Sequence, residues 1–234
     1  MSTLEADTLN SQTTNGDLTI IANGTGDVII DGLTMPTADG TANQVVETDG
    51  SGNLSFADAG GGATVLISNT AITGTPSTID ITGFDSSLYG GYLLKLNDVV
   101  FDADRQVWFK YSTDGGSTWA ATDYQQQSLN SAGTTVTGAT NSGNPGWLLD
   151  NAGIVDTSEG GLSSTIYVFE TGTSTKTWIH AMTGFPFSAP PKSSIDMLVG
   201  HTNTAVVIDA LQFRTNSGTF VAGGNISFYG LTKA

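Results

Sequence analysis

Aromatic side chains that stand beside carboxylates are the residues of this 234-residue chain best suited to binding chemistry. Tyr124 follows Asp123, and Trp147 is followed three residues later by Asp150. Sugar rings stack their apolar C–H faces on Trp or Tyr, while nearby carboxylates hold the hydroxyl groups. We therefore predict a carbohydrate-binding site that contains these four residues. The alternative is that the rings line the rim of the core or a subunit interface, as loop-end aromatics more often do.

Catalysis by carboxylates would need a pair placed across a substrate, about 5 to 9.5 Å apart for glycoside hydrolysis. Asp102 and Asp104 are close in sequence, and Glu159 or Glu170 could supply an acid. Nothing in the spacing pairs any two of them, and loop carboxylates that face water explain the pattern better. We therefore expect no catalytic residues and no enzymatic activity, with a glycan depolymerase as an alternative.

Metal and cofactor sites are not expected either. The chain has no cysteine, and its two histidines, His180 and His201, share no metal-ligand spacing. His180 lies in a strand-like run, where histidine more often packs against a neighbouring strand than binds a metal ion. The sequence contains no P-loop, no nucleophile elbow and no dinucleotide-binding fingerprint.

The stretch Ser112–Trp119 matches the pattern S-x-D-x-G-x-T-W, the Asp-box of sialidases and other β-propellers. A propeller would need this pattern in several blades, and here it occurs once. In the Asp-box the aspartate accepts the amide protons of a turn, glycine permits a positive φ, and tryptophan packs beneath the turn. We therefore predict that Asp114 organises a hairpin turn and takes no part in catalysis.

Charge argues against two classes of partner. Only 12% of the residues are charged, and 22 acidic against 7 basic residues give a net charge of −15. Such a chain is not expected to contact the phosphate backbone of nucleic acid or an anionic membrane surface. No apolar run approaches the length of about 18 residues that a membrane span needs, so membrane insertion is not expected.

Short strand-like runs after residue 63 must position any site. No segment favours a helix, because Gly, Thr, Asn or Pro interrupts every candidate. Many short strands with frequent turn signals are typical of a sandwich or barrel, so residues 63–234 are predicted to form an antiparallel, jelly-roll-like β-sandwich head. Ser128–Gly161 is rich in Gly, Ser, Asn and Thr and is predicted to be a long irregular loop. The predicted strands are Thr64–Ser68, Ser77–Ile81, Gly91–Leu96, Gln106–Ser112, Ile166–Glu170, Thr177–Met182, Ser194–His201, Ala205–Thr215 and Asn225–Tyr229.

Alternation within these runs predicts which side chains share one face of a strand. The apolar triplets are Val107, Phe109 and Tyr111; Tyr92, Leu94 and Leu96; and Ile195, Met197 and Val199.

Residues 1–62 differ from the rest and form a thin, polar, repetitive arm. Gly16–Ile20 recurs ten residues later as Gly26–Ile30, and more loosely as Gly52–Phe56. Each copy is a turn pair followed by an apolar/polar/apolar triplet, and one such hairpin is not stable alone. Three chains wrapped around an axis would bury all the triplets together. We therefore predict an extended, β-prism-like arm that forms a homotrimer; a floppy tether is the alternative.

The neck of the arm, Met35–Phe56, resembles the segment P-x-x-D-G-x-x-x-Q-V-L-x-T-D-G-x-G-x-L-S-W of tailed-bacteriophage fibre proteins. It departs from that pattern at Val46 and Glu47, and at Phe56, where tryptophan is usual. The rest of the chain is similar to the C-terminal modules of the same proteins. The stretches that carry this second similarity are Tyr92–Val99, Ser112–Trp119 with Tyr124, Leu211–Gly218 and Gly224–Leu231.

The resemblance implies a homotrimeric virion appendage, attached to other virion proteins through its N-terminal arm and displaying a β-rich head. It transfers no ligand residues, because such heads vary where they bind. The expected function is a tail fibre of the virion whose head contacts a host surface glycan during adsorption. A capsid-attached head fibre or decoration protein has the same architecture and is an open alternative.

Overall fold

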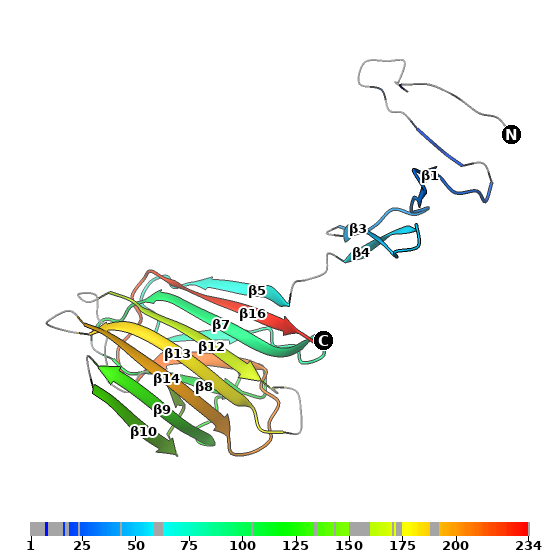
Figure 1. Ribbon diagram of the computed structural model, residues 1–234. Coiled ribbons are helices and arrows are strands. Elements are labelled where there is room, and N and C mark those ends of the chain that lie inside the picture. The colour runs from blue at the N-terminus through cyan, green and yellow to red at the C-terminus, as the bar shows by residue number, and fades with distance from the viewer. Residues whose placement is uncertain are drawn as a thin grey trace. The chain divides into compact units, whose positions relative to one another are not determined.

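The computed structural model describes residues 8, 16, 19–22, 24–42, 44–58, 63–103, 105–132, 135–142, 144–149, 160–169, 171, 175–187 and 192–233. All regular secondary structure in these ranges is β-strand, which confirms the predicted all-β fold (Figure 1). The chain divides into two compact units, Met1–Gly61 and Gly62–Ala234. The boundary predicted from the sequence, between residues 62 and 63, lies one residue later. No described segment forms a helix long and apolar enough to cross a membrane.

The head contains a large antiparallel sheet of eight strands, in the order β10-β9-β14-β13-β12-β7-β16-β5. Neighbouring strands in this order pair antiparallel throughout (Figure 1). Its strands are β5 (Thr64–Ala71), β7 (Tyr89–Val99), β9 (Tyr124–Ala132), β10 (Thr135–Ser142), β12 (Leu162–Phe169), β13 (Trp178–Phe187), β14 (Lys192–Thr202) and β16 (Asn225–Thr232).

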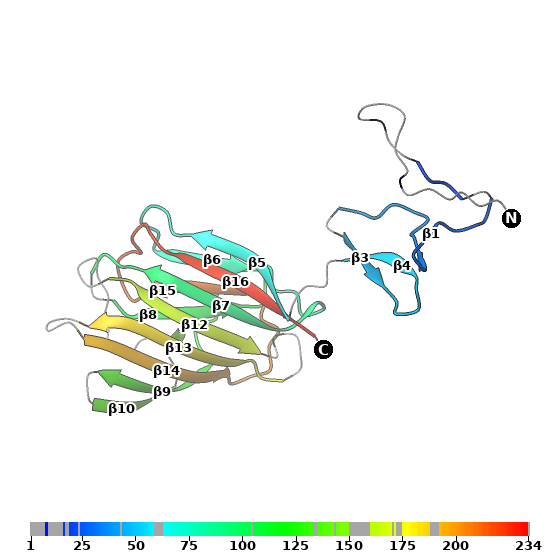
Figure 2. The same cartoon turned by 45° about the horizontal axis from the view of Figure 1, so that its top comes forward.

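A second sheet of four strands, in the order β11-β8-β15-β6, packs against one face of the large sheet (Figure 2). The two layers together form the predicted antiparallel sandwich. The strands of this second sheet are β6 (Thr78–Thr82), β8 (Val107–Ser112), β11 (Trp147–Leu148) and β15 (Ala210–Thr215). The predicted strand Ala205–Thr215 therefore begins five residues later than expected.

The core lies between the two sheets and is rich in aromatic rings. The triplets on β7 (Tyr92, Leu94, Leu96) and on β8 (Val107, Phe109, Tyr111) face this core and are buried, as the alternation predicts. Removing such side chains from water is the main favourable term in folding a sandwich of this size.

The prediction of an irregular loop at Ser128–Gly161 is wrong for its first part. β9 and β10 pair as a hairpin at the edge of the large sheet, with Ala132 opposite Thr135. The hairpin escapes prediction because its inward positions are polar: Gln126, Ser128 and Asn130 are buried. A strand whose core-facing positions are polar lacks the apolar alternation by which strands are recognised. Residues 150–159, in the later part of the predicted loop, lie outside the described residues.

The Asp-box forms the predicted turn. The carboxylate of Asp114 accepts hydrogen bonds from the backbone N–H of Thr118 (2.8 Å), the Thr118 hydroxyl (2.7 Å) and the Ser112 hydroxyl (2.7 Å). Gly116 has a φ of 88°, and the Trp119 ring lies against it. These bonds, chiefly those from Thr118, lower the pKa of Asp114 to about 2.

Replacement of Asp114 by asparagine is expected to lower the melting temperature at neutral pH. Because the folded-state pKa is depressed, the stabilisation is present above the ordinary value of 3.8 and is lost as the pH falls towards about 2. The difference in melting temperature between wild type and variant should therefore shrink across that window in thermal unfolding. Thr118→Val, which removes one donor, should show a smaller change of the same form. A difference that does not vary with pH would contradict this role.

The described part of the arm unit contains two short hairpins. β1 (Ile29–Ile30) pairs with β2 (Leu33–Thr34), and β3 (Gln44–Thr48) pairs with β4 (Leu54–Asp58). The repeats Gly26–Ile30 and Gly52–Phe56 each supply one of these strands, whereas Gly16–Ile20 lies partly outside the described residues.

The turn between β3 and β4 is organised by Asp49. Its carboxylate accepts hydrogen bonds from the backbone N–H of Ser51 (2.7 Å) and of Asn53 (3.1 Å). The hydrogen bond from the Asn53 side chain, together with these two backbone bonds, lowers the pKa of Asp49. The T-D-G-x-G element of the neck motif is therefore a turn-forming element.

Candidate functional site

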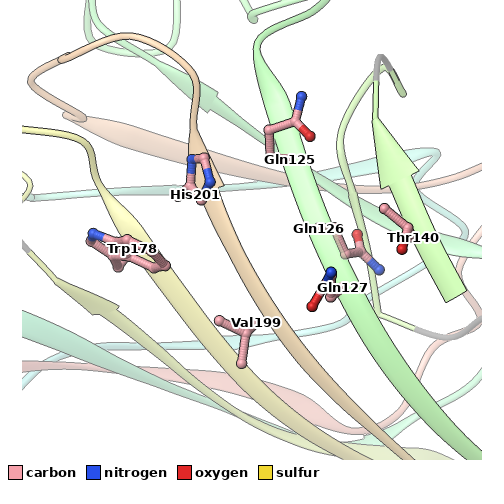
Figure 3. A pocket seen from close by; sticks show the side chains of 7 residues that line it. All are labelled: Gln125, Gln126, Gln127, Thr140, Trp178, Val199 and His201. Atoms are coloured by element: carbon pink, nitrogen blue, oxygen red, sulfur yellow. The ribbon is translucent and has the colours of Figure 1, made fainter. Parts of the chain in front are cut away.

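A shallow depression of about 290 Å³ lies on the face of the large sheet that points away from the core (Figure 3). It occupies neighbouring positions on four adjacent strands: β10, β9, β14 and β13. Its lining residues are Gln125, Gln126, Gln127, Thr140, Trp178, Val199 and His201.

Strand register assembles the depression in two adjacent rows. Trp178 of β13 lies opposite His201 of β14, which lies opposite Gln125 of β9. Two residues further along, Val199 lies opposite Gln127, which lies opposite Thr140 of β10. Residues two apart on a strand point to the same side, so both rows face outward together. Segments distant in sequence thereby form one continuous surface.

Trp178 and His201 form the aromatic side of the depression. The Trp178 side chain is 39% exposed, and its ring centroid lies 4.9 Å from that of His201 at an interplanar angle of 54°. The Nδ1 of His201 lies 2.8 Å from the carbonyl oxygen of Thr202. Because a carbonyl only accepts, Nδ1 donates this hydrogen bond, which leaves Nε2 as the ring nitrogen available to a ligand. The pair thus combines an open ring face with an oriented polar atom.

Neutral polar groups form the opposite side. The side chains of Gln127 and Thr140 are exposed and that of Gln125 is half-buried, so amide and hydroxyl groups are available there. Gln126 contributes through its backbone, since its side chain points inward and exchanges hydrogen bonds with the backbone of Leu148 (2.8 and 3.0 Å). None of the seven lining residues has a carboxylate, an ammonium or a guanidinium group.

The floor of the depression rests on Trp147 on the core side of the sheet. The Nε1 of Trp147 donates a hydrogen bond to the carbonyl oxygen of Gln125 (3.2 Å). Gly200 lies between Trp147 and the outer face, where a Cβ atom would come within 2.7 Å of the indole Cδ1 and 2.8 Å of the Gln125 carbonyl oxygen. Trp147 therefore positions the strands that carry Gln125 and His201, and the absence of a side chain at Gly200 permits its close approach.

Comparisons with family models, with curated proteins and with solved structures give no match.

Tyr124 and Trp147 are buried, which corrects the prediction that their rings stack on a ligand. The two side chains are 1% and 0% exposed and pack edge to face in the core, with ring centroids 4.7 Å apart. The Tyr124 hydroxyl donates to the carbonyl of Ala120 (3.0 Å), and burial raises the pKa of Tyr124. Neither ring offers an open face to a ligand. They belong to the core, which is the alternative that the sequence left open.

Asp123, the third predicted site residue, is engaged by neighbouring segments of the head. The carboxylate of Asp123 accepts hydrogen bonds from the Tyr111 hydroxyl (2.9 Å) and from the backbone N–H (3.1 Å) and hydroxyl (2.7 Å) of Thr204. The Thr204 bonds fasten the chain before β9 to the loop after β14, and the Tyr111 bond fastens it to β8. Asp150 lies outside the described residues.

The residues of the depression that sequence reasoning missed are Trp178, Gln125, Gln127 and Thr140. Trp178 lies in a predicted strand, and the signal for its outward direction is the alternation of Ile179 and Ala181, which take the core face. His201 also lies in a predicted strand, and its residue type alone suggests a metal ligand rather than a partner for an aromatic ring. Among the described residues, no group of three His, Asp or Glu side chains is arranged to hold a metal ion.

Proposed function

We propose that the chain is a homotrimeric virion fibre of a tailed bacteriophage, with an arm that attaches to other virion proteins and a head that contacts the host surface. The observation that carries this proposal is the neck, where the fibre-like motif coincides with the β3–β4 hairpin and its Asp49 turn. Attachment to the tail and attachment to the capsid use the same architecture. Electron microscopy of the particle tests the proposal, because density for this chain must project from the tail or from the capsid.

Exposed apolar side chains in the arm support assembly of several copies. Ile21, Ile29 and Ile30 are 82, 63 and 52% exposed, and Val46 is 51% exposed. A two-stranded hairpin has no core of its own and is marginally stable at best in water. Copies that wrap around one axis would remove these side chains from water.

Substitution of both Ile29 and Ile30 by aspartate is expected to convert the trimer into monomers. Sedimentation at micromolar concentration should give three times 24.1 kDa for the wild type and 24.1 kDa for the double variant. The reason is that six carboxylates would replace six apolar side chains around the axis. A matched control, Leu33→Asp, changes a less exposed neighbour and should weaken assembly less. A wild-type mass of 24.1 kDa would overturn the proposed assembly.

We further propose that the head binds a host glycan through the depression around Trp178. Carbohydrate recognition needs a ring face for stacking and neutral donors and acceptors for hydroxyl groups. Trp178, Gln127 and Thr140 supply both kinds of group on one surface. Since the seven lining residues carry no carboxylate, the proposed activity is binding without hydrolysis. Polysaccharide incubated with the protein should keep its chain length, and shortened chains would favour a depolymerase.

A further inference from the structure

An apolar surface covers part of the outer face of the large sheet next to the depression, and the two share Val199. We call it the apolar belt and define it by Leu129, Val136, Met182, Ile195, Met197 and Val199, which are 43 to 65% exposed. Together these side chains expose roughly 600 Å² of surface, at the upper end of the largest patches on ordinary monomers. An exposed patch of this size indicates an interaction surface.

Register places the members of the belt next to one another. Met182 of β13 lies opposite Met197 of β14, which lies opposite Leu129 of β9. In the adjacent row, Ile195 lies opposite Ser131, which lies opposite Val136 on the edge strand β10. The belt is therefore one flat patch that runs across four strands and reaches the edge of the sheet.

The strands that carry the belt place polar side chains in the interior. Ser194 and Asp196 alternate with Ile195 and Met197 on β14, and both polar side chains are buried. They have partners there: Asn130 donates a hydrogen bond to the Asp196 carboxylate, and the Ser194 hydroxyl donates to the carbonyl of Ser131 (2.7 Å). A half-solvated antiparallel sheet has the opposite pattern, apolar inside and polar outside. The pattern on β14 is that of a strand with a second covered face.

The distribution of charge on the head indicates which partner fits this face. On the described parts of β9, β10, β13 and β14, the outward positions hold no Asp, Glu, Lys or Arg. The chain as a whole carries a net charge of −15, so two copies repel each other over most of their surfaces. Depletion of charge together with enrichment in Met is also typical of the centre of protein interfaces. This uncharged face is where a second copy meets the least repulsion.

We propose that the apolar belt is the surface through which the heads of copies of this chain contact one another around the fibre axis. This inference rests on the proposed function, because the arm must first bring the heads together. Once the arm holds three heads at a high effective concentration, a patch smaller than the usual 800 Å² or so per partner is sufficient. His201 lies four residues along β14 from Met197, about 13 Å away. The Trp178–His201 side of the depression therefore lies beyond the centre of this contact, whereas Val199 belongs to both.

The test uses the absence of cysteine from the chain, which makes one introduced thiol unique. Met197→Cys places a thiol at the centre of the belt, and Leu88→Cys places one at a 60% exposed position between β6 and β7, outside the belt. Both full-length variants are treated with a maleimide, and their masses are measured by sedimentation. We expect the M197C thiol to react about tenfold more slowly than the L88C thiol. Both variants should sediment as trimers of three times 24.1 kDa.

Dilution and denaturation complete the experiment. Protection of the M197C thiol should decline when dilution produces monomers, and both thiols should react equally fast in denaturant. Equal, fast labelling in an intact trimer would overturn the belt contact and leave the proposed fibre in place. A monomeric mass at all concentrations would overturn both. A thiol that stays protected in a monomer would show that another part of the same chain covers the belt, which also overturns the inference.

Discussion

Replacement of Trp147 by alanine is expected to lower the free energy of unfolding of the head by about 3–5 kcal/mol, the usual cost of emptying the space of a buried large aromatic ring. The Trp147 ring is 0% exposed and lies 5.3 Å from the Phe109 centroid and 4.7 Å from that of Tyr124. Its loss also leaves the carbonyl of Gln125 without the indole donor. Chemical denaturation of the full chain, followed by tryptophan fluorescence and circular dichroism, measures the change.

Trp147→Phe is the matched variant for this prediction. Phenylalanine keeps most of the contacts with Phe109 and Tyr124 but cannot donate to Gln125, so its cost should be clearly smaller than that of alanine. A destabilisation by alanine of less than about 1 kcal/mol would be the typical result for a surface residue and would contradict the assigned core position. If Trp147 positions the floor of the depression, both variants should also weaken ligand binding at temperatures where the head is still folded.

The strands that the sequence predicts have a recognisable apolar face, which is the core face on β7 and β8 and the exposed face on β14. On β7 and β8 the triplets around Leu94 and Phe109 alternate with residues of the other face, and the two-residue period identifies both the strand and its buried side. The hairpin β9–β10 could not be predicted in this way, because Gln126, Ser128 and Asn130 take the inward positions. The burial of Gln126 and Asn130 depends on partners from distant segments, Leu148 for Gln126 and Asp196 for Asn130.

The candidate site was missed for a related reason. The sequence pattern predicts Trp147 in a loop, because the residues around it are small and polar. Its burial follows from contacts with β8 and β9, which no local pattern records. Trp178 lies in a predicted strand, but alternation alone does not tell which of the two faces of that strand packs against the core. The third triplet, Ile195 with Met197 and Val199, illustrates the same ambiguity, since it lies on the exposed face.

Substitutions at Trp147 and Trp178 therefore test the stability of the head and its proposed binding function separately. Trp147 and Trp178 lie on opposite sides of the sheet, and the strand register joins them through Gln125, His201 and Gly200. A change on the core side should alter folding first and binding as a consequence. A change at Trp178 should alter binding alone.

Replacement of Trp178 by alanine is expected to abolish most attachment to host cells while leaving the fold intact. Loss of a stacking platform worth about 1.4 kcal/mol weakens binding about tenfold for each head. If three heads bind together, the loss of avidity compounds this to about 10²–10³-fold for the trimer. The residue is 39% exposed, so the melting temperature should change little. Retention of fluorescent protein on host cells, measured over a range of concentrations, gives the affinity.

Trp108→Ala serves as the control, because Trp108 is a half-buried tryptophan on β8 in the other sheet. It should leave attachment unchanged and alter only stability. The same Trp178 substitution in the monomeric Ile29→Asp, Ile30→Asp background should show only the tenfold effect of a single head. Undiminished attachment by the trimeric Trp178→Ala variant would exclude the depression as the host contact. An equal loss in monomer and trimer would mean that the heads bind independently, because avidity multiplies the effect of Trp178 only where several heads engage one surface.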